Sequence, residues 1–150
     1  MKILSKNKFA NFHYEILEKY EAGIMLSGPE VKAVKNGQIS LKGSYVSIDP
    51  KNEVWLINSY ILPYQPAKSQ QANYDPARPK KLLLNKKEIN ALIGKGKQKG
   101  LTIIPLAVYT KKRLIKVEIA LVKGKSKIDK RATIKKREVN REIQRTLKSS

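Results

Sequence analysis

The strongest structural signal in this sequence is Leu114-Ile115-Lys116-Val117-Glu118-Ile119-Ala120-Leu121, in which large apolar residues recur at every second position. Successive side chains of a strand point to opposite faces, so this period places the branched apolar residues on one face and Lys116 and Glu118 on the other. The apolar run 101–109 precedes this stretch and is separated from it by the polar residues 110–113. The two runs predict an antiparallel β-hairpin with one buried face.

Further strands are predicted upstream of this hairpin. Residues 45–48 and 54–57 are apolar runs that flank the turn sequence Asp49-Pro50-Lys51-Asn52, which has proline at its second position. Proline favours that position because its ring fixes φ near the value that the turn requires, so the runs predict a second hairpin. Residues 22–26 predict another strand and residues 14–17 one more.

Two short helices are predicted from their capping signals. Ser27 followed by Glu30, and Asn85 followed by Glu88, have the spacing of a capping box, in which each side chain accepts from the other residue's backbone N–H. Asn36-Gly37 favours the end of the first helix, and the glycines at 94 and 96 favour the end of the second. The segment 63–81 contains four prolines and is predicted to be a long polar loop.

The order of these elements predicts the fold class. About six strands and two or three short helices before residue 123 predict a mainly β protein built as a small closed antiparallel β-barrel, OB-like in type. We therefore expect residues 1–122 to form one domain and residues 123–150 to form a basic C-terminal tail. Barrels of this type commonly bind oligonucleotides on their outer face.

The composition indicates a polyanionic partner. The 150 residues include 32 Lys and Arg against 12 Asp and Glu, a formal net charge of +20. Such a surface is self-repelling and is best tolerated when bound phosphates neutralise it, so nucleic acid is the favoured partner. An anionic membrane is the weaker alternative because no basic amphipathic helix with bulky apolar residues is evident, and we expect no membrane association.

The tail carries much of this charge. Residues 123–150 hold eleven Lys and Arg against three acids, a net charge of +8, which leaves +12 for residues 1–122. Their apolar residues form only a narrow helical stripe, Ala132, Val139, Ile143 and Leu147. We therefore predict a tail that is disordered when free and helical on an anionic surface.

Several classes of function are disfavoured. The sequence has no cysteine and a single histidine, His13, and Asp49, Asp75 and Asp129 lie outside any catalytic motif. We therefore expect no enzyme activity, no metal and no cofactor. No apolar stretch approaches 18 residues, so we expect neither a signal peptide nor a membrane span, and a cytoplasmic location.

Several blocks of the sequence recur in an order that resembles the SsrA-binding protein (SmpB) family. They span residues 7 to about 137 and comprise Asn7-Lys8, Tyr20-Glu21-Ala22-Gly23-Ile24, Gly28-Pro29-Glu30-Val31-Lys32, Ser44-Tyr45-Val46, Asp75-Pro76-Ala77-Arg78-Pro79-Lys80-Lys81-Leu82-Leu83-Leu84-Asn85, Lys123-Gly124-Lys125 and Asp129-Lys130-Arg131. Any one block alone would be a weak match, but their common register makes coincidence improbable.

The resemblance implies a role in ribosome rescue. Proteins of this family bind transfer-messenger RNA (tmRNA, also called SsrA RNA) and deliver it with EF-Tu and GTP to stalled ribosomes for trans-translation. By this resemblance the barrel binds the tRNA-like domain of the RNA, and the tail probes the empty decoding centre and mRNA channel, where 16S rRNA lies, and becomes helical there. We expect the protein to act as a monomer.

The resemblance also implies binding residues on the barrel. Asn7, Glu21, Leu83 and Asn85 match family positions linked to tmRNA binding, and Lys8, Lys32, Lys35 and Lys81 are candidate phosphate contacts. From the residues alone, Glu21 is equally well a surface glutamate beside a strand. Asn85 is equally well a helix N-cap, and both roles are compatible because a capping amide keeps its nitrogen available.

In the tail, the resemblance implies ribosome contacts from Gly124, Lys125, Ile128, Asp129, Lys130, Arg131 and Leu147. Ile128 departs from the family, which often has histidine or an aromatic residue there, so a stacking imidazole is absent. Phe12 and His13 also depart from the usual order, and we expect His13 to be structurally incidental.

Two alternative functions remain open at the sequence level. One is an intrinsic RNA-cleaving enzyme, which divalent-metal-dependent cleavage would reveal. The other is a constitutive ribosomal protein, since such proteins share small basic folds and extended tails. A ribosomal component would co-purify with a subunit at stoichiometric level in high salt, whereas a rescue factor would follow one non-ribosomal RNA.

Overall fold

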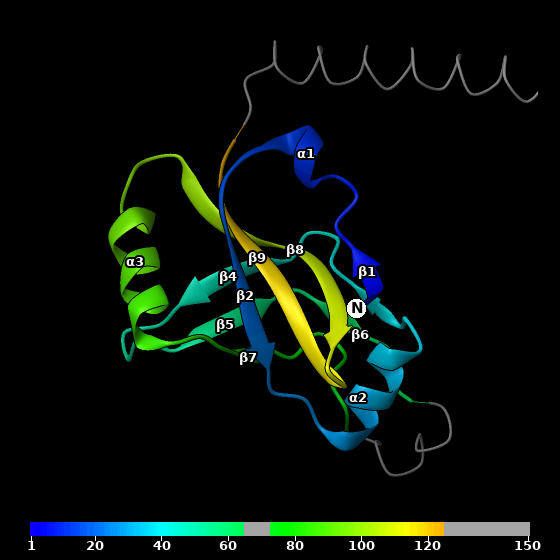
Figure 1. Ribbon diagram of the computed structural model, residues 1–150. Helices are drawn as coiled ribbons and strands as arrows, with labels where there is room; N and C mark the ends of the chain where they lie inside the picture. Colours follow the sequence, from blue (N-terminus) through cyan, green and yellow to red (C-terminus); the bar gives the residue numbers. More distant parts are fainter. Residues whose placement is uncertain (65–72, 125–150) are drawn as a thin grey trace, which may run out of the picture.

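The computed structural model describes residues 1–64 and 73–124. Its elements are β1 (Lys2–Lys6), α1 (Ala10–His13), β2 (Tyr14–Ile24), α2 (Gly28–Lys35), β3 (Ile39–Ser40), β4 (Tyr45–Ile48), β5 (Val54–Ile57), β6 (Tyr60–Ile61), β7 (Lys80–Leu83), α3 (Lys86–Gly96), β8 (Leu101–Lys111) and β9 (Leu114–Gly124) (Figure 1).

The strands close into a ring, as the sequence predicts. The pairing order is β8-β4-β5-β7-β2-β9, and β9 pairs back with β8, every ladder being antiparallel. Strand β1 pairs with the C-terminal half of β8, beyond the point where β4 contacts it. Closure leaves few unpaired strand edges, and the prediction of a small antiparallel barrel is therefore confirmed.

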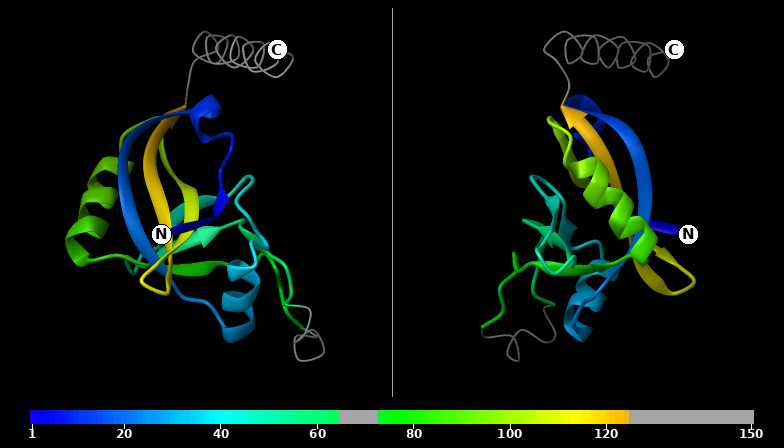
Figure 2. Two further views of the ribbon diagram at one scale, coloured as in Figure 1. Left: turned by 45° about the vertical axis from the view of Figure 1, so that its right-hand side comes forward. Right: turned by 90° about the vertical axis from the view of Figure 1, so that its left-hand side faces the viewer.

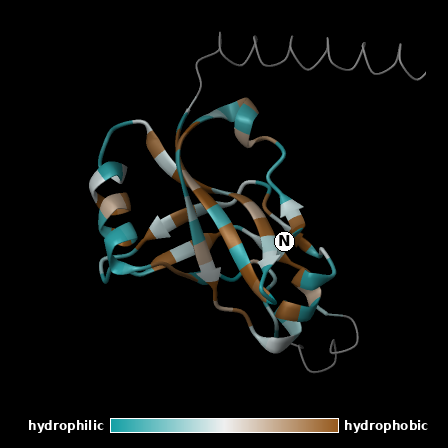
Figure 3. Cartoon of the chain, in the orientation of Figure 1, coloured by the Kyte–Doolittle hydropathy of each residue, from teal (hydrophilic) through white to brown (hydrophobic). Residues whose placement is uncertain are grey.

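Three long strands, β2, β8 and β9, form one wall of this barrel and lie side by side in the left view of Figure 2. On β9 the predicted alternation is confirmed, because Val117 and Ile119 are fully buried whereas Lys116 and Glu118 remain partly exposed. The same alternation is visible as alternating brown and teal along the strands in Figure 3. Strand β9 continues to Gly124, beyond the domain boundary expected at Val122.

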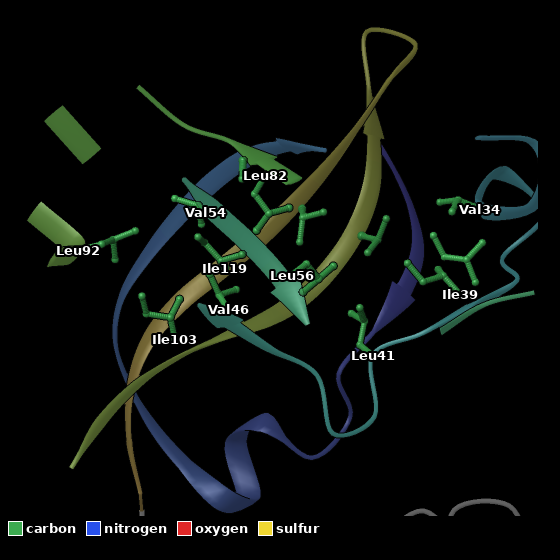
Figure 4. Close-up of a cluster of buried hydrophobic side chains, with 14 of the residues drawn as sticks. Val34, Ile39, Leu41, Val46, Val54, Leu56, Leu82, Leu92, Ile103 and Ile119 are labelled. Carbon is green, nitrogen blue, oxygen red and sulfur yellow. The ribbon is translucent and has the colours of Figure 1, made fainter. Parts of the chain in front are cut away.

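The barrel interior is filled by apolar side chains from every wall. Val46, Leu56 and Ile119 point toward one another between the strands (Figure 4). Leu92 of α3 and Val34 of α2 lie at opposite ends of this cluster, so the two helices close the two ends of the barrel. A second, smaller cluster lies beneath α1 and comprises Ala10, Ile104, Leu106, Ala120 and Val122.

Both predicted helices begin at their predicted caps. The Ser27 hydroxyl accepts from the Glu30 amide and the Glu30 carboxylate accepts from the Ser27 amide, at 3.3 and 2.9 Å. Asn85 and Glu88 form the equivalent pair at 2.8 and 3.3 Å. Helix α3 continues through Gly94, however, and ends at Gly96. The one-turn helix α1 has no side-chain cap, so it has no capping signal in the sequence.

The predicted hairpins are confirmed, with one difference in a turn. Strands β4 and β5 have the predicted bounds, and the Asp49 carboxylate closes their turn by accepting from the backbone amides of Lys51 and Glu53, both at 2.9 Å. Strands β8 and β9 extend further than predicted, so only Lys112 and Arg113 remain in their turn, with φ of 50° and 67°. Positive φ at both central residues is typical of a type I′ turn, whose twist matches that of the flanking strands.

The predicted loop 63–81 is wrong at its C-terminal end, where Lys80 and Lys81 begin strand β7. Strand β7 joins β5 to β2 and so completes the ring. Its first residue, Lys80, is fully buried, which a charged residue permits only with partners. The Lys80 ammonium donates to the carbonyls of Ser59 and Pro76 at 2.9 and 3.0 Å, and these partners lie outside the strand.

The two strands predicted at 14–17 and 22–26 belong to one continuous strand, β2, which ends at Ile24, so the prediction is wrong for Met25 and Leu26. An irregularity in its register with β9 lies between Ile16 and Glu18. Such a bulge bends the strand and shifts its alternation of faces, so the apolar period is interrupted in the sequence although the strand continues.

Candidate nucleic-acid interface

A row of side chains crosses the outside of the barrel from β1 to β7. The register pairs Ile3 with Tyr109, Tyr109 with Lys116, Lys116 with Gly23, and Gly23 with Leu83. Adjacent residues on these strands, Val108, Val117, Ala22 and Leu82, belong to the inner core, so the row itself faces outward. We call Ile3, Tyr109, Lys116, Gly23 and Leu83 the outer row.

The outer row presents apolar surface beside positive charge. Leu83 is 49% exposed and Ile3 is 46% exposed, although both lie on regular strands. A Cβ placed on Gly23 would lie 3.3 Å from the Leu83 Cβ, so the absence of a side chain at Gly23 makes room for Leu83. Leu83 therefore presents an exposed apolar side chain next to the bare backbone of Gly23, with Lys116 beyond it. A base or a ribose can pack on such a surface.

Glu21 lies next to this row on β2, directly opposite Glu118 of β9. Its carboxylate accepts a 2.5 Å hydrogen bond from the Tyr109 hydroxyl and lies 3.4 Å from the Lys111 ammonium. The Tyr109 hydrogen bond, and then Lys111, hold the pKa of Glu21 below its usual value. Burial and the bond to Glu21 raise the pKa of Tyr109. Glu21 is therefore an ionised acceptor close to Lys111 and opposite a second glutamate, Glu118.

Lys81 and Asn85 flank Leu83 on the same segment. Lys81 is only partly exposed, and its ammonium lies 3.8 Å from the Glu53 carboxylate, a weak surface pair. Asn85 uses its side-chain oxygen to cap α3 and is exposed. Its amide nitrogen and the first turn of α3 therefore remain near Leu83, and a helix N-terminus favours phosphate. Lys81, Leu83 and Asn85 thus lie on one segment beside β2. Leu83 pairs with Gly23, two residues along β2 from Glu21, whereas the Glu21 carboxylate itself is bonded toward β8.

The other candidate residues lie apart from this group. Asn7 has a structural use, since its backbone amide donates to the Leu106 carbonyl at 2.8 Å and its side-chain amide donates to the Pro105 carbonyl at 3.0 Å. Lys8 follows it and is exposed. Lys32 and Lys35 are exposed on α2, and the Lys32 ammonium lies 5.5 Å from the centre of the Tyr64 ring.

The ribosome contacts expected in the tail fall almost entirely outside the described residues, namely Lys125, Ile128, Asp129, Lys130, Arg131 and Leu147. Gly124 is described, is exposed, and pairs with Tyr14 immediately after α1. At about 3.4 Å per residue, Gly124 lies roughly 27 Å along β9 from Lys116. In Figure 1, α1 and the end of β9 lie at the opposite end of the barrel from the β8–β9 turn.

His13 lies on α1 and packs edge-on against Phe12, with ring centroids 4.7 Å apart. It also lines a cavity of about 530 Å³ between α1 and the start of β4, together with Phe9, Tyr14 and Tyr45. His13 thus lies among the aromatic side chains that line this cavity. A lone histidine in the sequence could not indicate this position.

Sequence reasoning missed a buried ionic cluster that anchors the end of the loop. The Glu30 carboxylate is almost fully buried and accepts hydrogen bonds from the Arg78 guanidinium and from the Tyr74 hydroxyl, the latter at 3.1 Å. Burial opposes ionisation of Glu30, but Arg78 and the Ser27 amide outweigh it, so the pKa of Glu30 lies below its usual value. Arg78 therefore serves folding, although it lies within the block that resembles the family.

Two absences apply to residues 1–64 and 73–124. There, no three histidine, cysteine, aspartate or glutamate side chains are grouped so that they could hold a metal ion. Over the same residues, no helix has both the length and the apolar content needed to cross a membrane.

Comparison with known proteins identifies the family. The family model described as SmpB protein matches residues 4–149. The SsrA-binding protein of Sulfurihydrogenibium sp. (strain YO3AOP1) is 52% identical over 98% of this chain and 95% of its own length. That of Gloeothece citriformis (strain PCC 7424) is 51% identical over 98% of this chain and 94% of its own length.

A solved structure described as "tmRNA-SmpB: a journey to the center of the bacterial ribosome" is also similar. It superposes with a TM-score of 0.67 at 43% identity and covers 87% of this chain and 93% of that chain. Because the family model matches almost the whole sequence and the relatives are about half identical to it over nearly their full lengths, the chain belongs to the SmpB family.

Proposed function

We propose that this protein binds tmRNA and delivers it to stalled ribosomes for trans-translation. The observation that carries the proposal is the outer surface of the barrel, where the outer row, which includes Leu83, is flanked by Glu21 on β2 and by Asn85 directly after β7, on a chain that belongs to the SmpB family. The barrel grips the tRNA-like domain of the RNA through this surface. It is an RNA-binding adaptor and not an enzyme.

Each part of this surface suits a different feature of RNA. The lysines and the first turn of α3 attract phosphates without regard to sequence. Leu83 provides apolar contact for a base or ribose. Glu21 can only accept when ionised, so it pairs with donors of a base edge or a ribose 2′-hydroxyl and repels misplaced phosphates. The combination favours a folded RNA over a random polyanion.

We further propose that residues 123–150 form a separate functional part that probes the empty decoding centre and the mRNA channel against 16S rRNA. Two observations support this division: the net charge of +8 in these residues, and the exit of the chain at Gly124, roughly 27 Å along β9 from Lys116. An RNA held on the outer row therefore leaves the other end of the barrel free. EF-Tu with GTP accompanies the complex by binding the RNA.

A truncation tests the two-part proposal. Because β9 runs to Gly124, the chain should be cut after Gly124 so that the strand stays complete. The shortened protein should bind tmRNA with an affinity near that of the full chain but fail to support tagging of stalled products. Urea unfolding of both proteins verifies that the barrel is intact, and loss of tmRNA binding by a folded truncation contradicts the division.

A further inference from the structure

The residue that holds Glu21 in place comes from a strand that Glu21 does not pair with. Tyr109 lies on β8, Glu21 lies on β2, and β9 runs between them. The Tyr109 hydroxyl nevertheless donates a 2.5 Å hydrogen bond to the Glu21 Oε2 atom. Tyr109 is only 6% exposed, so its ring is packed on the barrel wall and its hydroxyl is held in a fixed position.

Glu21 also has a residue of like charge opposite it in the sheet. Glu118 faces it directly across the β2–β9 ladder, and like charges opposite one another destabilise a sheet. The charged and titratable groups that face Glu21 from the other strands are Tyr109 and Lys111 on β8 and Lys116 and Glu118 on β9. Among these, Tyr109 makes the shortest contact and Lys111 lies 3.4 Å away.

We propose that Tyr109 is a positioning residue for RNA recognition, which fixes the Glu21 carboxylate in one orientation so that its remaining acceptor directions face donors of the RNA. This inference rests on the proposed function and assigns Tyr109 a part in it. A carboxylate offers about four acceptor directions; Tyr109 occupies one on Oε2, and the Lys111 ammonium lies at a longer 3.4 Å from both oxygens. The remaining directions suit an amino or imino group of a base edge or a ribose 2′-hydroxyl.

Orientation matters here because the group to be bound is a directional donor. A lysine contacts a phosphate from many angles, whereas a hydrogen bond to a carboxylate weakens steeply when its angle falls toward 120°. Without the Tyr109 hydroxyl, Glu21 would sample other orientations, including closer pairing with Lys111 or Lys116. The Tyr109 hydrogen bond limits the carboxylate to one orientation before RNA arrives, which lowers the entropy cost of binding.

The test uses Tyr109→Phe in the full-length protein, with tmRNA transcript as the probe. Phenylalanine keeps the packed ring and removes only the hydroxyl. The dissociation constant for tmRNA should rise about two- to tenfold, because binding must then bear the cost of immobilising the Glu21 side chain. Glu21→Gln should weaken binding at least as much. The double variant should bind no worse than Glu21→Gln alone, since the tyrosine acts through the carboxylate.

A pH profile separates positioning from a merely structural role. Without the hydroxyl, the pKa of Glu21 rises, so binding by Tyr109→Phe should be lost at a higher pH on acidification than binding by the unaltered protein. Glu21→Gln corrects for titration of the RNA itself. Tyr60→Phe, which removes a hydroxyl from the exposed face of β6, is the matched control and should bind as the unaltered protein does.

The outcomes distinguish the inference from the proposed function. If the unaltered protein does not bind tmRNA, the proposed function fails. If it binds and Tyr109→Phe binds equally well, the positioning role is overturned and the proposed function stands. The positioning role is likewise overturned if the losses of binding free energy caused by Tyr109→Phe and Glu21→Gln add fully in the double variant. It is also overturned if Tyr109→Phe does not shift the pH dependence of tmRNA binding.

Discussion

Asn85 illustrates how one residue can serve both the fold and the proposed RNA contact. Its oxygen caps α3 by accepting from the Glu88 amide at 2.8 Å, and its nitrogen lies at an exposed position near Leu83. Asn85→Ala should lower the free energy of unfolding by about 1 kcal/mol through loss of the cap. Asn85→Asp keeps a good cap but loses the amide donor and adds a negative charge.

These two variants separate stability from binding. In urea unfolding, Asn85→Asp should be close to the unaltered protein, and Asn85→Ala should not. In a tmRNA binding assay under the same buffer, Asn85→Asp should be the weaker binder because its carboxylate repels phosphate. Equal binding by Asn85→Asp and the unaltered protein would leave Asn85 with a capping role only.

Lys80 should make stability depend on alkaline pH. Burial lowers its pKa to about 8 from the 10.5 expected in an unfolded chain, against the opposing effect of Glu30. Between these values the unfolded state binds more protons, so the free energy of unfolding should rise with pH. The expected gain is about 2 kcal/mol from pH 8 to 10. The neutral amine still has two N–H groups for the carbonyls of Ser59 and Pro76.

Urea unfolding at several pH values checks this, with Lys80→Met as the comparison. The methionine variant lacks the titrating group, so its stability should rise less over the same range. Burial and then Glu30 raise the pKa of Tyr74, which shares the Glu30 cluster, so Tyr74 lowers stability only as the pH approaches the unfolded value of 10.0. Both proteins contain Tyr74, so the comparison removes its contribution. Parallel pH profiles for the two proteins would refute the assignment to Lys80.

At the scale of elements, the β8–β9 turn is strained by its own residues. Lys112 and Arg113 both have positive φ, which costs a residue with a Cβ about 1–2 kcal/mol. Lys112→Asn with Arg113→Gly supplies the residues that a type I′ turn favours. This double variant should raise the free energy of unfolding by about 1 kcal/mol after the greater unfolded-state freedom of glycine is subtracted.

A matched pair of variants isolates the backbone effect. Lys112→Gln with Arg113→Gln removes the same two charges and keeps the strain, so it should not gain comparable stability in urea unfolding. If both pairs are equally stabilised, relief of charge repulsion and not turn geometry is the cause.

For the whole molecule, the charge of the barrel, +12 of the net +20, should govern the salt dependence of RNA affinity. If about five phosphates are neutralised, the logarithm of the tmRNA association constant should fall with the logarithm of salt concentration at a slope of about −3.5 to −4.5. Lys81→Gln should reduce the magnitude of the slope by about 1 if Lys81 contacts a phosphate. Filter-binding titrations across salt concentrations measure both, and a nearly flat response would contradict the electrostatic account.

The sequence by itself determined the parts of this protein that depend on neighbours along the chain. The caps of α2 and α3 were predictable because Ser27 and Glu30, or Asn85 and Glu88, meet within one helical turn. The β4–β5 hairpin and the buried face of β9 were predictable because turn residues and a period of two are local patterns. The family could also be inferred from the sequence, because the sequence blocks that resemble it occur in the family's order.

Only the tertiary structure decided the arrangement of the site. Leu83 lies beside Gly23 because β7 pairs with β2, and the Tyr109 hydroxyl reaches Glu21 across β9. These strands lie far apart in the sequence. The sequence around Lys80 predicts a loop. Only the folded structure supplies the carbonyls of Ser59 and Pro76, which accept hydrogen bonds from the Lys80 ammonium and allow strand β7 to begin at a buried lysine. The physical reason is the same in each case: a side chain's partners, and hence its burial and ionisation, depend on which strands close the barrel, and no local pattern encodes that pairing.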